Sequence, residues 1–120
     1  MCGITGYYAL SSSCSAEPDL EAMTDVLAHR GPDDRGLYRD GRAGLGMRRL
    51  SIIDLAHGKQ PIPNETGRLQ VIFNGEIYNY RELRAQLTAC GHGWSTGSDT
   101  EAIVHGYEEW GDQVVTRLRG

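Results

Sequence analysis

The sequence predicts an α+β fold, because segments with the pattern of strands are mixed with segments that have the spacing of helices. Residues 3–10 carry no charge and alternate loosely between apolar and small side chains, which predicts a buried strand. Apolar residues between 17 and 29 recur with helical spacing, which predicts an amphipathic helix. The chain has 120 residues, 39% of them hydrophobic and 16 of them Gly, so we expect one domain, or part of one, with many turns.

The N-terminal half of the chain continues mainly with strand signals. Pro18 is tolerated in the first turn of the helix at 17–29, and Gly and Pro residues end that helix. The apolar face of the helix is expected to comprise Leu20, Met23, Val26 and Leu27. The pattern then predicts a charged loop at 30–36, strands at 37–39 and 45–54 around an Asp40-Gly41 turn, a surface connection at 55–67 and a strand at 69–73.

The C-terminal half is expected to be helical. Asn79 and Glu82 have the spacing of a capping box ahead of a helix at 80–90, which Gly91 would end. Ser98 and Glu101 have the same spacing ahead of a second helix, which Gly111 would end. The buried stripe of this second helix is expected to comprise Ile103, Val104, Tyr107 and Trp110, and helical spacing continues through 112–119.

The composition excludes several classes of function. Twelve basic residues against sixteen acidic ones give a net charge of −4, so the basic excess of a nucleic-acid-binding domain is missing. No run approaches the roughly 20 apolar residues of a membrane span, and no signal peptide opens the chain. We therefore expect no nucleic-acid partner and no membrane partner.

The spacing of cysteines and histidines predicts neither a disulfide framework nor a metal site. The cysteines, which are odd in number and form no Cys-x-x-Cys pair, are Cys2, Cys14 and Cys90. The histidines, for which we expect surface or packing roles, are His29, His57, His92 and His105. We expect a reducing, cytoplasmic location and no metal or cofactor in this chain.

Cys2 has a second interpretation besides that of a small hydrophobic residue at the start of a strand. Removal of the initiator methionine, which is favoured before a small residue, would leave a cysteine with both a thiol and a free α-amine. These groups titrate near 8.5 and near 7.7 to 8.0, so they can exchange a proton at neutral pH without a histidine. One residue would then be nucleophile and base.

Five motifs favour this second interpretation, and they occur in a fixed order along the chain. They are Cys2-Gly3-Ile4, Arg30-Gly31-Pro32-Asp33, Arg49-Leu50-Ser51-Ile52-Ile53-Asp54, Asn74-Gly75-Glu76-Ile77-Tyr78-Asn79 and Gly97-Ser98-Asp99. Together they resemble the glutaminase domain of glutamine-dependent asparagine synthetases, which are class II glutamine amidotransferases of the N-terminal nucleophile hydrolase superfamily. Pro32 points to the asparagine synthetase branch of the class. The resemblance implies an αββα sandwich.

The resemblance also implies a role for each matched residue. Cys2 would attack the side-chain amide of glutamine to form a thioester and release ammonia, and water would then release glutamate. The Asn74 side chain and the Gly75 N–H would stabilise the oxyanion, although an Asn-Gly pair also suits a plain hairpin turn. Arg49 would bind the α-carboxylate of glutamine, and Asp99, in the first turn of the second capped helix, would bind its ammonium group.

The neighbours of these residues have weaker assignments. Glu76 is expected to help hold the amino end of the substrate. Arg30 and Asp33 would shape the loop that walls the pocket, or form ordinary loop ion pairs. Arg48, which faces away from Arg49 on a strand, is expected to be solvated surface.

The resemblance covers residues 1–120, and we expect it to represent only part of a glutaminase domain, with an incomplete sandwich. The family ordinarily continues with a strand after a segment like Leu118-Arg119-Gly120. No synthetase domain is present, so ATP and magnesium would belong elsewhere. The expected partners are L-glutamine and a synthetase domain or a full-length amidotransferase chain. A non-catalytic module that binds glutamine or docks on a synthetase, and a gene fragment without function, are the alternatives.

Overall fold

A computed structural model describes residues 2–10, 18–50 and 58–120 of the chain. The chain divides into two compact units: unit 1 holds the described residues up to Leu50 together with Lys59–Pro61, and unit 2 holds Gly58 and Ile62–Gly120. Both units combine helix with antiparallel sheet, which confirms the α+β prediction. Within the described ranges, no helix is long and apolar enough to cross a membrane.

The sheet of unit 1 has three antiparallel strands in the order β1-β3-β2. The strands are β1 (Gly3–Tyr8), β2 (Asp34–Asp40) and β3 (Ala43–Arg49). Gly41, with a φ of 50°, turns the β2–β3 hairpin, which confirms the predicted turn. β2 begins three residues earlier than predicted, and residues 51–54 of the predicted third strand lie outside the described residues.

Strand β1 is less buried than predicted. Ile4 is 48% exposed and Tyr8 is 61% exposed, whereas Gly3 is buried. The apolar pattern at 3–8 therefore identifies a strand correctly, but the expectation that it is a buried one is wrong for these two side chains.

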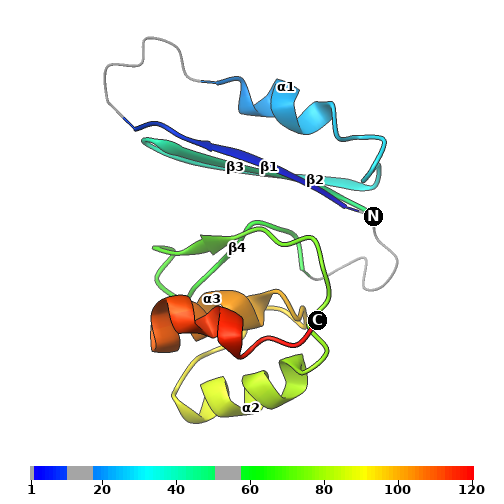
Figure 1. Cartoon of the computed structure of the whole chain (residues 1–120). Helices are drawn as coiled ribbons and strands as arrows, with labels where there is room; N and C mark the ends of the chain where they lie inside the picture. Colours follow the sequence, from blue (N-terminus) through cyan, green and yellow to red (C-terminus); the bar gives the residue numbers. More distant parts are fainter. Residues whose placement is uncertain (1, 11–17, 51–57) are drawn as a thin grey trace. The chain divides into compact units, whose positions relative to one another are not determined.

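Helix α1 (Leu20–Asp25) lies along one face of this sheet (Figure 1) and is shorter than the helix predicted at 17–29. Asp19 is its N-cap, and one carboxylate oxygen accepts a hydrogen bond of 3.0 Å from the Ala22 N–H. Leu20 is fully buried, but Val26 follows the helix and is 71% exposed, so the predicted apolar face does not extend that far. The cap therefore sets the start of the helix two residues after Pro18 and excludes this proline from the first turn.

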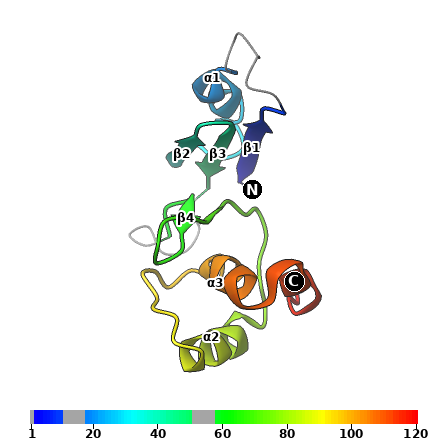
Figure 2. The same ribbon diagram turned by 90° about the vertical axis from the view of Figure 1, so that its left-hand side faces the viewer.

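Unit 2 holds a small hairpin and two packed helices. Its elements are β4 (Ile62–Pro63), β5 (Gln70–Val71), α2 (Tyr80–Ala89), α3 (Glu101–Trp110) and the 3-10 helix η1 (Gly111–Thr116). Figure 2 shows α2 and α3 side by side, and the buried core between them comprises Ile77, Leu83, Leu87 and Ala102. Tyr107 is 45% exposed, so the predicted buried stripe of the second helix is wrong at that position.

Both predicted capping boxes are wrong in their contacts. Asn79 precedes α2, but its side chain makes no cap bond: its Nδ2 donates to the Arg117 carbonyl and its Oδ1 accepts from the Arg119 N–H. Thr100, not Ser98, is the N-cap of α3. The Asn79 side chain thus has tertiary partners, whereas the Ser98 Oγ accepts a hydrogen bond of 3.2 Å from the N–H of Thr100 and the Glu101 carboxylate bonds Ser95 and Thr96. Gly91, with a φ of 104°, follows the end of α2 as predicted.

Candidate active site

The first part of the candidate site lies in unit 1, where β1 begins beside the end of β3. Gly3 pairs with Arg48 across the two strands, and this antiparallel register places the preceding residue, Cys2, opposite Arg49, the residue before Leu50. The Leu50 N–H donates to the Cys2 sulfur at 3.5 Å, and the sulfur lies 4.0 Å from the Leu50 carbonyl oxygen. Cys2 is half-buried.

The Arg30-Gly31-Pro32-Asp33 loop closes against the same strand ends. The Arg30 Nε donates to the Cys2 carbonyl oxygen at 3.1 Å. Gly31 is buried, and a Cβ at this position would overlap the carbonyl group of Arg48. The motif therefore requires glycine here because the loop backbone touches the backbone of β3. Arg30, predicted to shape the loop that walls the pocket, holds the backbone of the candidate nucleophile.

The two neighbouring arginines at the end of β3 have different surroundings. The Asp33 N–H donates to the Arg49 carbonyl at 3.1 Å, and Arg49 pairs with Asp34 of β2. The Arg48 side chain is only 15% exposed, its Nε donates to the Gly31 carbonyl at 3.0 Å, and its guanidinium lies 3.7 Å from Asp25. The prediction of a solvated Arg48 is therefore wrong, because this side chain is largely buried and bonds the backbone of the loop that contains Gly31.

The second part of the candidate site lies in unit 2, in the segment that follows β5. Asn74, Gly75 and Glu76 are exposed, and a Cβ on Gly75 would crowd the ring of Phe73. The Oδ2 of Asp99 accepts a hydrogen bond of 2.7 Å from the Ile77 N–H, directly after this segment. Within unit 2, the structure thus brings the Asn-Gly-Glu motif and Asp99 together. Asp99 lies before α3 rather than in its first turn, because the helix begins at Glu101.

Glu101 supports the segment that carries Asp99, a role that the sequence did not indicate. Its carboxylate is 1% exposed and accepts hydrogen bonds from the N–H and hydroxyl groups of both Ser95 and Thr96. Burial acts to raise the pKa of Glu101, but the hydrogen bonds from Thr96, Ser95 and His105 outweigh it and lower that pKa. The carboxylate therefore stays ionised and fixes the turn that leads to Asp99.

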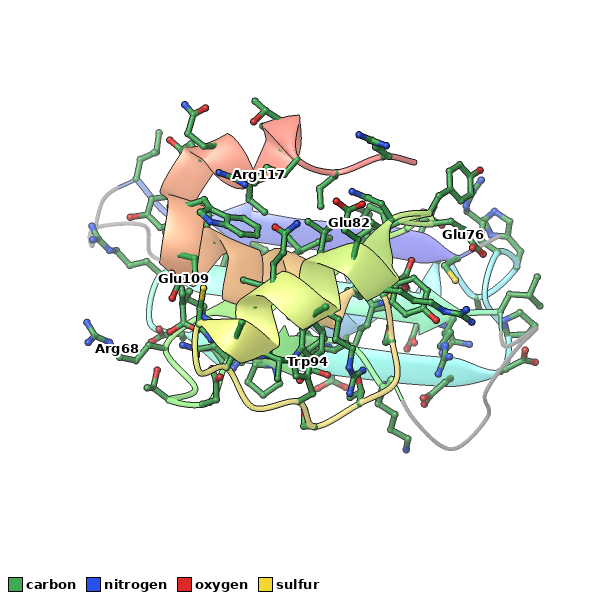
Figure 3. The ribbon with its side chains drawn as sticks, turned by 90° about the horizontal axis from the view of Figure 1, so that it is seen from below. Arg68, Glu76, Glu82, Trp94, Glu109 and Arg117 are labelled. Atoms are coloured by element: carbon green, nitrogen blue, oxygen red, sulfur yellow. The ribbon has the colours of Figure 1, made fainter. Side chains whose placement is uncertain are left out.

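Unit 2 also contains a cluster of histidines and glutamates. The residues are Glu65, His92, His105 and Glu108. Burial acts to raise the pKa of Glu65, but its hydrogen bonds with backbone N–H groups and His92, and the charge of His105, lower it to about 2. Figure 3 shows Glu76 beside the start of α2 and Glu109, a neighbour of the cluster, towards its other end. The cluster is thus separate from the Glu76 segment, and its four residues come from segments whose spacing in the sequence indicates no common site.

A cysteine directly before strand β1, with Arg30 on its carbonyl oxygen, and an Asn-Gly-Glu segment after β5 are features by which the chain resembles the class of glutamine amidotransferase domains. The chain matches the family described as "Glutamine amidotransferase domain" over residues 1–120 and belongs to that family.

Its curated relatives include two asparagine synthetases (glutamine-hydrolyzing) of Bacillus subtilis (strain 168). Number 1 is 42% identical over 123 residues, and number 2 is 47% identical over 123 residues. Asparagine synthetase (glutamine-hydrolyzing) 1 of Arabidopsis thaliana is 44% identical over 121 residues. Each match covers 100% of this chain and 20%, 16% and 20% of the relative, respectively. The chain thus spans about a fifth of the length of these relatives.

Proposed function

We propose that the chain is a glutaminase unit that converts L-glutamine and water into glutamate and ammonia through a thioester on Cys2. The observation that carries the proposal is the hydrogen bond from the Leu50 N–H to the Cys2 sulfur, next to Arg49, in a member of the glutamine amidotransferase domain family. The other four motifs of the sequence support the same reaction.

The proposed first step is attack of the Cys2 sulfur on the side-chain amide carbon of glutamine. After removal of Met1, the α-amine of Cys2 takes the thiol proton and later gives it to the leaving nitrogen, so that the C–N bond breaks and ammonia departs. Water then attacks the thioester, the same amine takes its proton, and the sulfur leaves with the release of glutamate. The Leu50 N–H supports the sulfur whenever it carries negative charge, and Arg30 holds the Cys2 backbone.

The proposed binding roles follow from the charges of free glutamine. Arg49 pairs with the α-carboxylate, in the bidentate geometry that a guanidinium favours. Asp99, with Glu76, binds the α-ammonium group. The Asn74 amide and the Gly75 N–H stabilise the oxyanion, where each donor contributes about 2.7 to 4 kcal/mol.

The names of the relatives extend the proposal to the whole protein. We propose the αββα architecture for the domain, a synthetase domain or an amidotransferase chain as its partner, and aspartate as the acceptor of the ammonia. ATP and magnesium would be bound by that partner. Free thiols such as Cys90 suit a reducing compartment, and we propose the cytoplasm.

The test is glutamate and ammonia release from L-glutamine, with Cys2→Ala and the matched control Cys90→Ala, which alters an exposed thiol. We expect activity that is lost in Cys2→Ala and retained in Cys90→Ala, and mass spectrometry should show that Met1 has been removed. Retention of Met1 in an active chain contradicts the mechanism. Glutamine binding without turnover by the unaltered chain would instead identify a non-catalytic binding module.

A further inference from the structure

Two histidines of unit 2 point the same ring nitrogen at the same pair of carboxylates. The Nδ1 of His92 lies 3.1 Å from Glu65 and 3.7 Å from Glu108. The Nδ1 of His105 lies 3.2 Å from Glu65 and 3.8 Å from Glu108. One ligand atom from each of these four residues lies within 4.8 Å of the others.

These separations match those of a small coordination site. A tetrahedral zinc ion with bonds of about 2.0 to 2.1 Å has ligand atoms about 3.3 Å apart. The nitrogen–oxygen distances from 3.1 to 3.8 Å lie around that value. The wider pairs of ligand atoms, which lie up to 4.8 Å apart, would have to move closer together around one ion.

Three of the four proposed ligands, His92, His105 and Glu108, are held in orientation by a further polar group. The Nε2 of His92 lies 3.0 Å from Glu109, and the Nε2 of His105 lies 3.2 Å from Glu101. Such carboxylates fix the tautomer that leaves Nδ1 available to a metal. The Asn64 Nδ2 donates to Glu108 Oε1 at 2.7 Å, and this leaves the Oε2 atom facing the two histidines.

The second, independent observation concerns the His105 ring. This side chain is 1% exposed, yet its Nδ1 makes no hydrogen bond, although Glu65 is close. It is the one buried side-chain nitrogen or oxygen without a hydrogen-bond partner among residues 2–10, 18–50 and 58–120. A buried polar atom without a partner costs free energy, and an ion between the four residues would remove that cost.

The charge of the cluster also favours a cation. Glu65, Glu108, Glu109 and Glu101 surround only two imidazole rings. In the described part of the chain, no lysine or arginine forms an ion pair with any of these carboxylates. A divalent ion with two neutral histidines and two ligating glutamates would form a neutral centre.

We propose that Glu65, His92, His105 and Glu108 form a binding site for a divalent transition metal, with zinc as the fitting ion. Two imidazole nitrogens and two carboxylate oxygens suit zinc better than calcium or magnesium, which prefer oxygen ligands alone. Four protein ligands leave no position for substrate, so the ion has a structural role. It ties the β4–β5 hairpin and the loop after α2 to helix α3. The site does not depend on glutamine hydrolysis.

The test is titration of the chelator-treated chain with Zn²⁺ in an isothermal titration calorimeter. The amount of metal bound per chain is then measured after gel filtration. We expect one ion per chain and an increase in the thermal unfolding midpoint, because the ion binds only the folded state. The variant His92→Gln should bind at least about 100-fold more weakly, whereas His29→Gln, which changes an exposed histidine of unit 1, should bind like the unaltered chain. Glu109→Gln should weaken binding by about 10- to 100-fold, since it removes only the orienting carboxylate.

Substitution with Co²⁺ provides a readout that folding alone does not change. We expect the visible absorption of four-coordinate Co²⁺, and its loss in Glu65→Gln with the helical circular dichroism retained. Failure of the folded chain to take up Zn²⁺ overturns the proposal and leaves a network of hydrogen bonds and ion pairs between these histidines and glutamates. Equal uptake by His92→Gln and His29→Gln also overturns it, because the ion would then be bound elsewhere.

Discussion

The Arg30 Nε lies 3.1 Å from the carbonyl oxygen of Cys2, although 28 residues separate the two positions. The guanidinium thereby joins the loop after α1 to the residue proposed as the nucleophile. A charged donor on a backbone carbonyl fixes the direction in which the cysteine presents its thiol and its amine.

Arg30→Gln should lower kcat by about 10- to 100-fold, since a hydrogen bond to a charged group contributes about 1.5–3 kcal/mol. Glutamine should still bind, so KM should change less than kcat if the main role of Arg30 is to position Cys2. Steady-state glutaminase kinetics check this, with Arg39→Gln on the exposed surface of β2 as the control. An unchanged kcat in Arg30→Gln would show that the contact has no catalytic consequence.

Asp99 accepts a hydrogen bond from the Ile77 N–H and is proposed to bind the ammonium group of glutamine, and two substitutions can separate these roles. Asp99→Asn keeps an oxygen for the Ile77 N–H but removes the charge proposed to bind the substrate ammonium, so KM should rise about 10- to 100-fold with little loss of stability. Asp99→Ala should raise KM as well and also lower the thermal unfolding midpoint. Glutamine kinetics and thermal denaturation measure both effects. Equal KM values for Asp99→Asn and the unaltered chain would contradict the binding role.

Gly31→Ala should destabilise unit 1 by about 1–3 kcal/mol, because the added Cβ meets the backbone of Arg48 and the loop has to move. Gly93 provides the matched control, since a Cβ at that position meets nothing within 4 Å. Urea denaturation should give a reduced midpoint for Gly31→Ala and a change within about 0.5 kcal/mol for Gly93→Ala. The prediction fails if the two variants unfold alike.

Glu101→Gln should cost about 3 kcal/mol of stability, because an amide group replaces a buried carboxylate that accepts hydrogen bonds from Ser95 and Thr96. Glu82→Gln is the control, as Glu82 is exposed on α2 and accepts a hydrogen bond of 3.5 Å from Gln86 of the same helix. Chemical denaturation measures both variants. A loss below about 0.5 kcal/mol in Glu101→Gln would mean that the hydrogen bonds contribute nothing net.

The strands and helices of this chain were predictable to the extent that local pattern determines them. The Asp40-Gly41 turn and the glycine after α2 follow from backbone conformations that few other residues adopt. The predicted start of α2 at Tyr80 is confirmed, but the contacts of the polar side chains at the starts of α2 and α3 were not predictable, because these side chains bond residues outside their own helix. The Asn79 side chain bonds residues 117 and 119, and Glu101 bonds the loop before it.

The sequence motifs indicated which residues form the candidate site, but they did not indicate the contacts that hold those residues in place. The motifs identify Cys2 and Asp99, whereas the contacts of Arg30 with Cys2 and of Asp99 with Ile77 depend on long-range pairing. The same is true of Arg48. Its position on a strand predicts surroundings different from those of Arg49, but its hydrogen bond to the Gly31 carbonyl could not be predicted without the three-dimensional structure.

The hydrogen bond of 2.7 Å from the Tyr78 N–H to the Arg119 carbonyl oxygen leaves Gly120 pressed against the carbonyl group of Glu76. A side chain introduced at position 120 would therefore push on the peptide that follows Asn74 and Gly75, more than 40 positions earlier in the chain. Substitutions in this last segment, although distant in the sequence, should therefore displace Asn74 and Gly75. These two residues carry the donors proposed to stabilise the oxyanion.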